Sequence, residues 1–351
     1  MGEDFADFSK ILLQWYGIHK RDLPWRGVKN PYYVWLSEVI LQQTRISQGL
    51  PYYLNFIKNF PTIQALAEAS EEKIFKVWQG LGYYSRAKNL HLAAKYITDE
   101  LQGVFPMTYD KLLLLKGVGD YTASAIASIC FNEPKATVDG NVYRVLSRIF
   151  DIELPINSSE GIKYFKQLAT CLLDKKRAGE YNQAIMDFGA IQCKPQSPNC
   201  SQCVMNGKCL AYKLQKVNQL PVKLPKTKIT YRYFHYCILI DTQGQTSLEK
   251  RKEKDIWQGL YEFPLIELKE NTIEDSLLIK RIKEKYPKAV QVEKYITTFV
   301  HKLTHQYIHA FFWKVTLEEK LTEGIPFSSI YEYPMPILII KFLKTLDIFE
   351  R

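Results

Sequence analysis

The amino-acid sequence predicts an all-α N-terminal domain followed by a smaller α+β domain. Residues 5–216 carry the helical period, with apolar residues at steps of three and four, as at Leu112, Leu115, Ala123 and Ile126. Beyond them, 231–240 and 307–315 are rich in aromatic and β-branched residues, which predicts strands. A further helix is expected over 272–286. Helices in one part and strands with one helix in the other indicate two domains of different class.

The length of the chain also indicates two domains, because 351 residues exceed what one hydrophobic core commonly holds. Between the two parts, 218–230 contains Pro221, Pro225 and several lysines and has little helical periodicity. Such a composition is typical of an interdomain linker. We therefore assign 1–217 to the helical domain, 218–230 to the linker and 231–351 to the α+β domain.

The charge of the chain favours a polyanionic partner. The formal net charge is +10 and the pI is about 9.0, while hydrophobic residues make up 46% of a globular composition. The first ten residues are acidic and carry no apolar stretch, which argues against a secretory signal. The apolar run 337–340 is too short to span a bilayer. We expect a protein of the cytosol that binds nucleic acid and no membrane.

Four of the seven cysteines lie in one short segment. Their spacings are x6, x2 and x5, and the residues are Cys193, Cys200, Cys203 and Cys209. Thiolates this close in a loop can converge on one centre, and the spacing alone is compatible with zinc or with a [4Fe–4S] cluster. An odd number of cysteines without a secretory signal makes a disulfide framework improbable. The remaining three, Cys130, Cys171 and Cys237, have apolar neighbours that suit core packing.

A second motif is a tight turn between two predicted helices. Residues 113–128 read LLLKGVGDYTASAIAS, with Gly117 and Gly119 at the turn and Lys116 before it. Glycines there let backbone N–H groups approach a phosphate, and the start of the following helix adds its dipole. The alternative is an ordinary turn between two helices.

Two carboxylates stand in unusual settings. Glu38 lies within 32–45, which is apolar nearly all round and therefore reads as a buried helix. A carboxylate in such a setting has a partner or is held partly protonated. Asp139 precedes Gly140 at a turn that opens a helix. The alternatives are a surface glutamate and a simple N-cap aspartate.

These motifs together resemble a known family. The pattern C-x6-C-x2-C-x5-C over 193–209 looks like the iron–sulfur loop of the endonuclease III superfamily of DNA glycosylases, and 112–129 looks like its helix-hairpin-helix, with Lys116 where proline is commoner. SEVILQQT and VDGNVYRV are similar to the catalytic segments of MutY-type adenine DNA glycosylases. The resemblance covers nearly the whole chain.

The resemblance implies one [4Fe–4S] cluster and assigns roles to the carboxylates. Glu38 would protonate the leaving adenine, and Asp139 would stabilise the oxocarbenium-like sugar or trap it covalently. Tyr121 and Asn141 match positions that support this pair. Relatives that nick DNA carry a lysine in the form GVGxKTA, whereas this chain has GVGDYTA. Because Tyr121 cannot form a Schiff base, we expect base release without efficient strand cleavage.

The same resemblance assigns residues to DNA recognition. The target base has to leave the stack before it reaches Glu38. Phosphate contacts are expected at the hairpin, through Lys116, Gly117 and Gly119. The vacated space and the opposite base would be probed by Gln42, Gln43 and Thr44. GLGYYSR over 80–86 resembles the family's wedge loop, with Tyr83 as the intercalating aromatic and Arg86 at its end. The adenine pocket would be lined by Arg21, Trp25, Leu41 and Gln183.

The α+β domain resembles a Nudix fold at KDIWQGLYEFP, 254–264. The helix that would carry the catalytic carboxylates reads SLLIKRIKEKYP and lacks them, so the resemblance implies the fold without its hydrolysis. VHKLTHQYI, 300–308, is similar to the MutY segment that inspects 8-oxoguanine. That segment ends in Phe-Ser-His in the family, and here the matching residues are Leu303, Thr304 and His305.

The function implied is that of a monomeric repair enzyme in the bacterial cytosol, associated with the nucleoid. Its partner would be double-stranded DNA with adenine opposite 8-oxoguanine or guanine. Three alternatives remain at this point: a pyrimidine-specific endonuclease III-like glycosylase, a non-catalytic iron–sulfur protein that binds DNA, and an active Nudix hydrolase.

Overall fold

A computed structural model describes residues 2–225, 229–270 and 274–346, and it divides the chain into two compact units. The first unit comprises 1–68 and 89–225, and the second comprises 69–88 and 226–351. The second unit therefore takes in a segment of the predicted helical domain. Within the predicted linker, 226–228 lie outside the described residues, as do 272 and 273 of the predicted helix.

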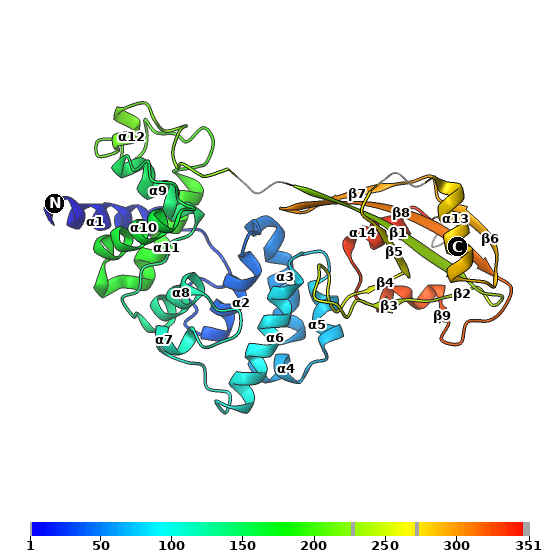
Figure 1. Ribbon diagram of the computed structural model, residues 1–351. Coiled ribbons are helices and arrows are strands. Elements are labelled where there is room, and N and C mark those ends of the chain that lie inside the picture. Colours follow the sequence, from blue (N-terminus) through cyan, green and yellow to red (C-terminus); the bar gives the residue numbers. More distant parts are fainter. Residues whose placement is uncertain (1, 226–228, 271–273, 347–351) are drawn as a thin grey trace. The chain divides into compact units, whose positions relative to one another are not determined.

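The first unit is all helical, as predicted (Figure 1). Its helices are α1 (Gly2–His19), α2 (Pro31–Leu41), α3 (Ile46–Asn59), α4 (Ile63–Glu68), most of α6 (Tyr84–Asp99), α7 (Tyr109–Leu112), α8 (Asp120–Phe131), α9 (Gly140–Phe150), α10 (Ser159–Leu172), η1 (Lys175–Arg177), α11 (Ala178–Ile191) and α12 (Leu210–Lys213). α11 packs against α1, α8 and α9, and α2 packs against α8. These contacts hold α2, which carries Glu38, and α9, which begins after Asp139, in one helical unit.

Helix α2 is buried because it has almost no polar side. Asn30 caps its first turn by accepting a hydrogen bond from the Tyr32 backbone N–H at 2.9 Å, and Pro31 occupies the first helical position. Its fully buried side chains include Trp35 and Leu36. At roughly 1.5–3 kcal/mol for each large apolar side chain, this burial fixes the helix firmly. A polar residue on α2 is therefore held in place by its apolar neighbours.

The second unit is an α+β domain that also contains helix α5 (Glu71–Trp78). Its other elements are β1 (Thr230–Ile240), β2 (Gln245–Thr246), β3 (Glu249–Lys250), β4 (Tyr261–Glu262), β5 (Leu265–Leu268), α13 (Asp275–Lys285), β6 (Ala289–Lys294), β7 (Phe299–Lys302), β8 (Gln306–Leu317), β9 (Ile325–Pro326), η2 (Phe327–Glu332) and α14 (Ile337–Leu343). Glu72 of α5 accepts hydrogen bonds from Lys250 Nζ and the Tyr261 hydroxyl, both at 2.9 Å. An amphipathic helix from the middle of the chain is thus part of this unit.

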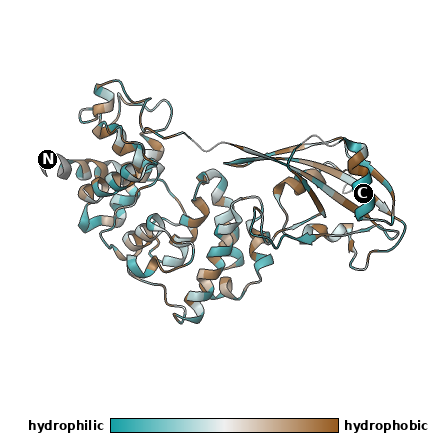
Figure 2. Ribbon diagram, viewed as in Figure 1, coloured by the Kyte–Doolittle hydropathy of each residue, from teal (hydrophilic) through white to brown (hydrophobic). Residues whose placement is uncertain are grey.

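A five-stranded mixed sheet forms the centre of the second unit. The strand order is β5-β1-β8-β6, with β7 also paired to β8; the long central pair β1 and β8 is parallel and the other pairs are antiparallel. One face packs with α13 around Cys237, Leu239, Trp313 and Val315, and the other packs with α14 around Phe234, Phe312 and Phe342. Figure 2 shows hydrophobic residues along the strands. The predicted α+β class is confirmed.

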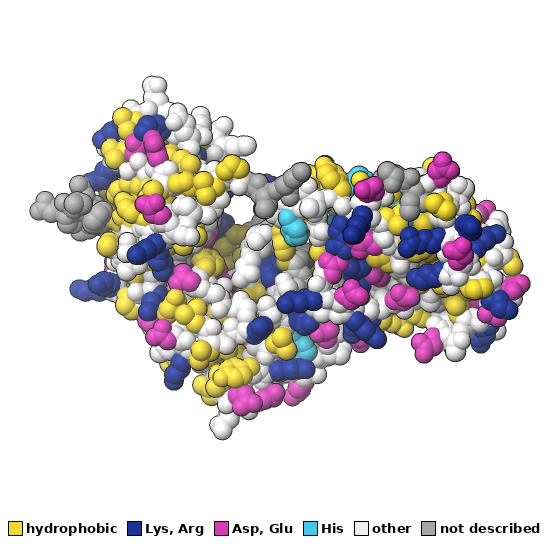
Figure 3. Space-filling model, viewed as in Figure 1, with side chains coloured by type: hydrophobic (Ala, Val, Ile, Leu, Met, Phe, Trp, Pro, Cys, Tyr) yellow, Lys and Arg dark blue, Asp and Glu magenta, His cyan; other side chains and the backbone are white. Residues whose placement is uncertain are grey.

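The surface carries both signs of charge. On the face shown in Figure 3, Lys and Arg side chains alternate with Asp and Glu over the second unit. In the part of the chain that the structure describes, no helix is long and apolar enough to cross a membrane.

Candidate active site and metal centre

A cavity of about 520 Å³ in the first unit brings the two predicted carboxylates together. Glu38 comes from α2, Asp139 from the start of α9, and Tyr121 from the first turn of α8. The predicted residues that also line it are Arg21, Trp25, Leu41, Gln43, Thr44 and Asn141. These positions are scattered over 120 residues of sequence, and the packing of α2, α8 and α9 makes them neighbours.

Glu38 lies in an environment that favours its protonated form. The Tyr121 hydroxyl donates a hydrogen bond to its Oε2 at 2.8 Å, and no other hydrogen bond to it is formed among the described residues. Burial raises the pKa of Glu38, and Asp139 adds to this, whereas the Tyr121 hydrogen bond and the charge of Arg26 oppose it. Desolvation with a single donor keeps a carboxyl group partly protonated, as a general acid requires.

Asp139 lies in the contrasting environment. It caps α9, and its Oδ1 accepts hydrogen bonds from the backbone N–H groups of Asn141 at 2.9 Å and Val142 at 2.8 Å, while Oδ2 accepts one from Asn141 Nδ2 at 2.7 Å. Burial raises the pKa of Asp139, but the three hydrogen bonds and the charge of Arg144 oppose that rise. Three donors directed at one carboxylate favour its anionic form. The cap and an anionic role therefore coexist.

Arg26 also lines this cavity and is held by Asp187, and neither residue is among the predicted site residues. Asp187 is fully buried on α11 and accepts hydrogen bonds from Arg21 Nε at 3.0 Å and Arg26 Nη2 at 2.7 Å. Arg26 lines the cavity and acts on the pKa of Glu38 through its charge. A carboxylate inside the apolar segment AIMDFGAI was a signal of the same kind as Glu38.

Gln183 does not line the cavity. Its Oε1 accepts hydrogen bonds from Arg26 Nη1 and from the Tyr16 hydroxyl. The structure thus places Gln183 behind Arg26, where it fixes the guanidinium group that faces Glu38.

A chain of hydrogen bonds runs from Asp139 to the cysteine segment. Asn141, which donates to Asp139, accepts from Arg144 Nη2 at 2.9 Å. Arg144 is buried, and it also donates to the carbonyl oxygens of Gly189 at 2.6 Å and Cys193 at 2.7 Å. α9 and α11 approach each other closely at Gly189. A Cβ added there would lie 2.6 Å from the Cβ of Asn141.

We expect Gly189→Ala to lower both stability and activity. The added methyl group meets Asn141 Cβ at 2.6 Å and Asn141 O at 3.0 Å, so α9 has to shift. Overpacking of this kind costs about 1–3 kcal/mol, and Asn141 moves away from Asp139. Thermal unfolding measures the first effect, and the base release that the resemblance implies measures the second. Gly17→Ala is the control, because its Cβ meets nothing within 4 Å in α1 and alanine favours a helix.

The predicted hairpin has the backbone that a phosphate contact requires. Gly117 has φ +79°, and a Cβ there would lie 2.6 Å from Asn89 Cβ. Gly119 is the N-cap of α8 and is exposed, as is Lys116, so N–H groups at the start of α8 face solvent. Gln42, at the C-cap of α2, donates through Nε2 to Thr122 Oγ1 at 3.2 Å and so joins α2 to the hairpin's second helix.

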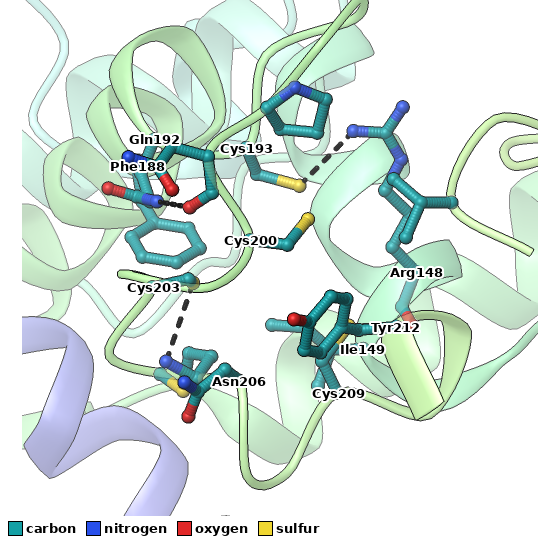
Figure 4. A pocket seen from close by; sticks show the side chains of 14 residues that line it. Arg148, Ile149, Phe188, Gln192, Cys193, Cys200, Cys203, Asn206, Cys209 and Tyr212 are labelled. Atoms are coloured by element: carbon teal, nitrogen blue, oxygen red, sulfur yellow. Dashed lines mark hydrogen bonds between the residues drawn. The ribbon is translucent and has the colours of Figure 1, made fainter. Parts of the chain in front are cut away.

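The four clustered cysteines line one pocket at the end of α9 and α11 (Figure 4). Buried Arg148 donates to Cys193 Sγ at 3.5 Å, and the Met205 backbone N–H donates to Cys203 Sγ at 3.4 Å. Burial raises the pKa of the Cys203 thiol to about 11 and the Met205 N–H group opposes that rise, so a metal would have to supply the charge that holds a buried thiolate. The cation and the N–H group at sulfur fit such a centre. Among the described residues, no three His, Cys, Asp or Glu side chains form a group that could hold a single metal ion, so the fit is to a cluster in which each sulfur binds a different iron.

The second unit brings the predicted wedge loop to the predicted reading segment. Tyr83 has φ +49° and is 48% exposed, and its hydroxyl lies 2.7 Å from Thr304 Oγ1. Tyr83, Leu303, Thr304 and His305 line one pocket of about 220 Å³. Arg86 lies beside the loop, with its guanidinium carbon 5.5 Å from the centroid of the Tyr83 ring. Residues 303–305 form the turn between β7 and β8.

Comparison with known proteins decides the family. Residues 36–167 match the HhH-GPD superfamily of base excision DNA repair proteins, and 235–345 match the NUDIX domain. An adenine DNA glycosylase of Buchnera aphidicola from Schizaphis graminum is 37% identical over 303 residues, which cover 86% of this chain and 85% of that protein. The chain belongs to the adenine DNA glycosylase family. A glycosylase of the same name from Mus musculus is 40% identical over 270 residues, covering 74% of this chain and 52% of its own.

Solved structures agree with the helical fold of this glycosylase. A thermostable thymine-DNA glycosylase matches 60% of the chain and 98% of its own, with a TM-score of 0.56 and 28% identity. A non-covalent endonuclease III–DNA complex matches 61% and 98%, with a TM-score of 0.53 and 22% identity, and so supports the fold alone. The predicted MutY-type family, the helix-hairpin-helix domain and the Nudix-like domain are confirmed.

Proposed function

We propose that this glycosylase hydrolyses the N-glycosidic bond of adenine mispaired with 8-oxoguanine or guanine in double-stranded DNA. The observation that carries the proposal is the pair Glu38 and Asp139 in one cavity, with one donor on the first carboxylate and three on the second. Two carboxylates in contrasting environments are what acid-assisted glycoside cleavage requires.

The reaction follows from these environments. Once the adenosine is extruded into the cavity, Glu38 transfers its proton to a ring nitrogen of adenine while the bond between the sugar C1′ and the base breaks. The electron pair of that bond leaves with the base, and the Asp139 anion stabilises the positive charge that develops on the sugar. Water then adds to C1′, and the Glu38 carboxylate accepts its proton.

The base is released without strand cleavage. Tyr121 occupies the position where a lyase needs an amine, and its hydroxyl is engaged with Glu38 at 2.8 Å. A phenol forms no Schiff base with the open sugar, so the abasic strand stays intact. Asn141 supports the reaction by holding the Asp139 anion at 2.7 Å.

Recognition of the mispair is divided between the units. In the first unit, Arg21, Trp25 and Leu41 hold the extruded adenine, and Gln183 positions Arg26. The gap that the adenine leaves is probed by Gln42, Gln43 and Thr44. The DNA phosphates are bound at the hairpin, by Lys116, Gly117 and Gly119. In the second, Tyr83 enters the stack beside Arg86, while Leu303, Thr304 and His305 inspect 8-oxoguanine. The Tyr83–Thr304 contact supports joint action of the last two groups.

The test of this function is a base-release assay on three duplexes. We expect adenine to be lost from duplexes containing 8-oxoguanine:adenine and, more slowly, guanine:adenine, with strand breaks only after alkali. A duplex containing thymine glycol should remain intact. Release of thymine glycol with no loss of adenine would assign the site to an endonuclease III-like reaction instead.

A pH profile of adenine release tests the role of Tyr121. Because Glu38 acts protonated, release under single-turnover conditions should fall as pH rises through its raised pKa. The Tyr121 hydrogen bond stabilises the carboxylate and lowers that pKa, so Tyr121→Phe should move the alkaline limb to higher pH. Tyr181→Phe is the control, because its buried hydroxyl has no hydrogen-bond partner among the described residues. A limb that stays in place in Tyr121→Phe contradicts the assignment.

We also propose that Cys193, Cys200, Cys203 and Cys209 bind one [4Fe–4S] cluster. In such a cluster each thiolate binds its own iron, so the four sulfurs need not converge on a single ion. The cluster would supply a rigid cross-link of the loop 193–209, and Arg148, whose Nη1 lies 3.5 Å from Cys193 Sγ, would balance its charge.

Metal analysis and stability measurements check this cluster. The purified protein should carry about four iron atoms and absorb broadly in the visible. Cys203→Ala should lose both and unfold at a lower temperature, because binding free energy contributes to folding. Cys171→Ala, at an exposed cysteine outside the segment, is the control. One zinc per chain with no visible absorbance would replace the cluster by a zinc site.

We further propose that the protein acts as a monomer on DNA in the bacterial cytosol, close to the nucleoid. Its net charge of +10 supports association with DNA. Sedimentation with and without a duplex measures its oligomeric state.

A further inference from the structure

One face of the central sheet of the second unit carries a row of aromatic rings. Tyr231 and Tyr233 of β1 pair in register with Tyr307 and His309 of β8, and alternate residues of a strand point to the same side. The Tyr231 and Tyr307 ring centroids are 5.7 Å apart, and Tyr233 stacks on His309 at 5.1 Å. We call these four residues the aromatic face.

Most of the aromatic face lies beyond the helix that covers this side of the sheet, and only Tyr233 packs against the cluster beneath that helix. α13 packs on Cys237, Leu239, Trp313 and Val315, toward the other ends of β1 and β8. Figure 1 shows α13 over that end, with β1, β7 and β8 extending past it. Tyr231 is 54% exposed. Val300 of β7, which lies opposite His309 of β8, is 51% exposed. Cross-strand pairing stabilises a sheet, but it does not require rings to be open to solvent.

A cation accompanies the rings. Lys302 of β7 is opposite Tyr307 in register, and its Nζ lies 5.3 Å from the centroid of that ring. Lys302 is exposed, and no carboxylate within the described residues forms an ion pair with it. Its charge is therefore available to a phosphate rather than neutralised at the surface.

Partly exposed aromatic rings, with Tyr231 the most open, beside an exposed lysine have the chemistry that unpaired nucleobases bind. Bases stack on such rings with little sequence preference, and the cation follows the phosphate backbone. Protein interfaces also use tyrosine but are depleted in lysine, so Lys302 favours a polyanion over a protein partner. The face also begins next to the β7–β8 turn, because the Thr230 backbone N–H donates to the His305 carbonyl oxygen at 3.1 Å. Nucleic acid that contacts this turn is therefore already beside the rings.

We propose that the aromatic face is a binding site for single-stranded DNA, with two or three unpaired bases stacked on Tyr231, Tyr307 and His309 and a phosphate at Lys302. This site is distinct from the cavity of Glu38 and Asp139. It does not depend on which base the enzyme excises.

The test measures binding of the full chain to a fluorescent oligothymidylate of about eight nucleotides, a length within the range of such sites. Tyr231→Ala combined with Tyr307→Ala should weaken binding about tenfold or more, and Lys302→Gln should reduce its salt dependence. The control combines Tyr96→Ala with Tyr164→Ala, two tyrosines of the first unit that are each 43% exposed. Unchanged affinity in the first double variant, or an equal loss in the control, would overturn the proposal.

Photocrosslinking of the unaltered protein provides a readout that does not depend on the folding of variants. An oligonucleotide with a halogenated uracil should form adducts on peptides that contain Tyr231 or Tyr307. Adducts confined to the first unit would overturn the proposal. Adenine release from duplex DNA, measured in parallel, should be unchanged in Tyr231→Ala with Tyr307→Ala, so failure of this site is distinguishable from failure of the proposed repair reaction.

Discussion

Glu38→Gln should abolish adenine release while leaving binding to the mispaired duplex intact. Glutamine is nearly isosteric and can still accept the Tyr121 hydroxyl, now at 2.8 Å from Oε2. It cannot transfer a proton to the leaving base. General acid catalysis contributes about 10²- to 10⁴-fold, and we expect the single-turnover rate to fall by at least that range. Quench-flow release of adenine and a duplex-binding assay measure the two properties separately.

The control for this variant is Glu180→Gln, the same substitution on the exposed surface of α11. Glu180 forms an ion pair with Arg177, and exposed pairs contribute little to stability, so activity and unfolding temperature should stay near those of the unaltered protein. An active Glu38→Gln enzyme would show that the carboxylate is a buried structural group. A variant that is inactive because it no longer binds the duplex would also contradict the assignment.

The sequence could predict Glu38 because a single property marks it. A carboxylate within an apolar helix has no water to solvate it, so a partner or a shared proton is needed whatever the rest of the fold. Asp187 carries the same mark within α11. Its partners, Arg21 and Arg26, precede it by more than 160 residues, and nothing local to either arginine identifies the carboxylate that it pairs with.

The same limit applies to the residues that link the cavity to the cysteine segment. Arg144 reads as an ordinary basic position on a helix with a strongly apolar side. Its burial and its hydrogen bonds to Asn141, Gly189 and Cys193 arise only when α9 packs on α11. Motif spacing and apolar context predicted the ligands and carboxylates, whereas long-range packing determines which polar groups connect them.

The grouping of 69–88 with the second unit could not be predicted from helical periodicity. Helix α5 has an apolar side with Ile74, Phe75 and Trp78, and its N-cap Ser70 accepts from the Lys73 N–H, so its helical character is readable from the sequence. Periodicity shows that one side is buried but not against which element. Gly259, which approaches Phe75 so closely that a Cβ would lie 2.6 Å from its ring, belongs to the second half of the chain. The grouping of 69–88 with that half follows from such contacts.

Asp139→Asn should separate the two roles of Asp139, because asparagine keeps the cap and removes the charge. Asparagine and aspartate are similarly good N-caps, so the bonds from the Asn141 and Val142 N–H groups persist. The new side-chain NH2 group of residue 139 then faces Asn141 Nδ2, which is also a donor, because Arg144 holds the Asn141 oxygen. The hydrogen bond between these two side chains is therefore lost. Stability should fall by only about 0.5–1.5 kcal/mol. The developing sugar cation loses its counter-charge, and adenine release should fall by about 10²- to 10³-fold.

Asp174→Asn is the matched control, because Asp174 caps η1 in the same way, accepting from the Lys176 and Arg177 N–H groups at 2.9 and 3.1 Å. Both variants should unfold within a few degrees of the unaltered protein, and only Asp139→Asn should lose activity. If Asp139→Asn released adenine within about threefold of the normal rate, Asp139 would be a cap alone. Asp139→Ala completes the comparison: it loses both roles, so it should combine the rate of Asp139→Asn with the further destabilisation of about 1 kcal/mol that follows loss of an N-cap. A rate for Asp139→Ala well below that of Asp139→Asn would show instead that the cap itself positions the catalytic groups.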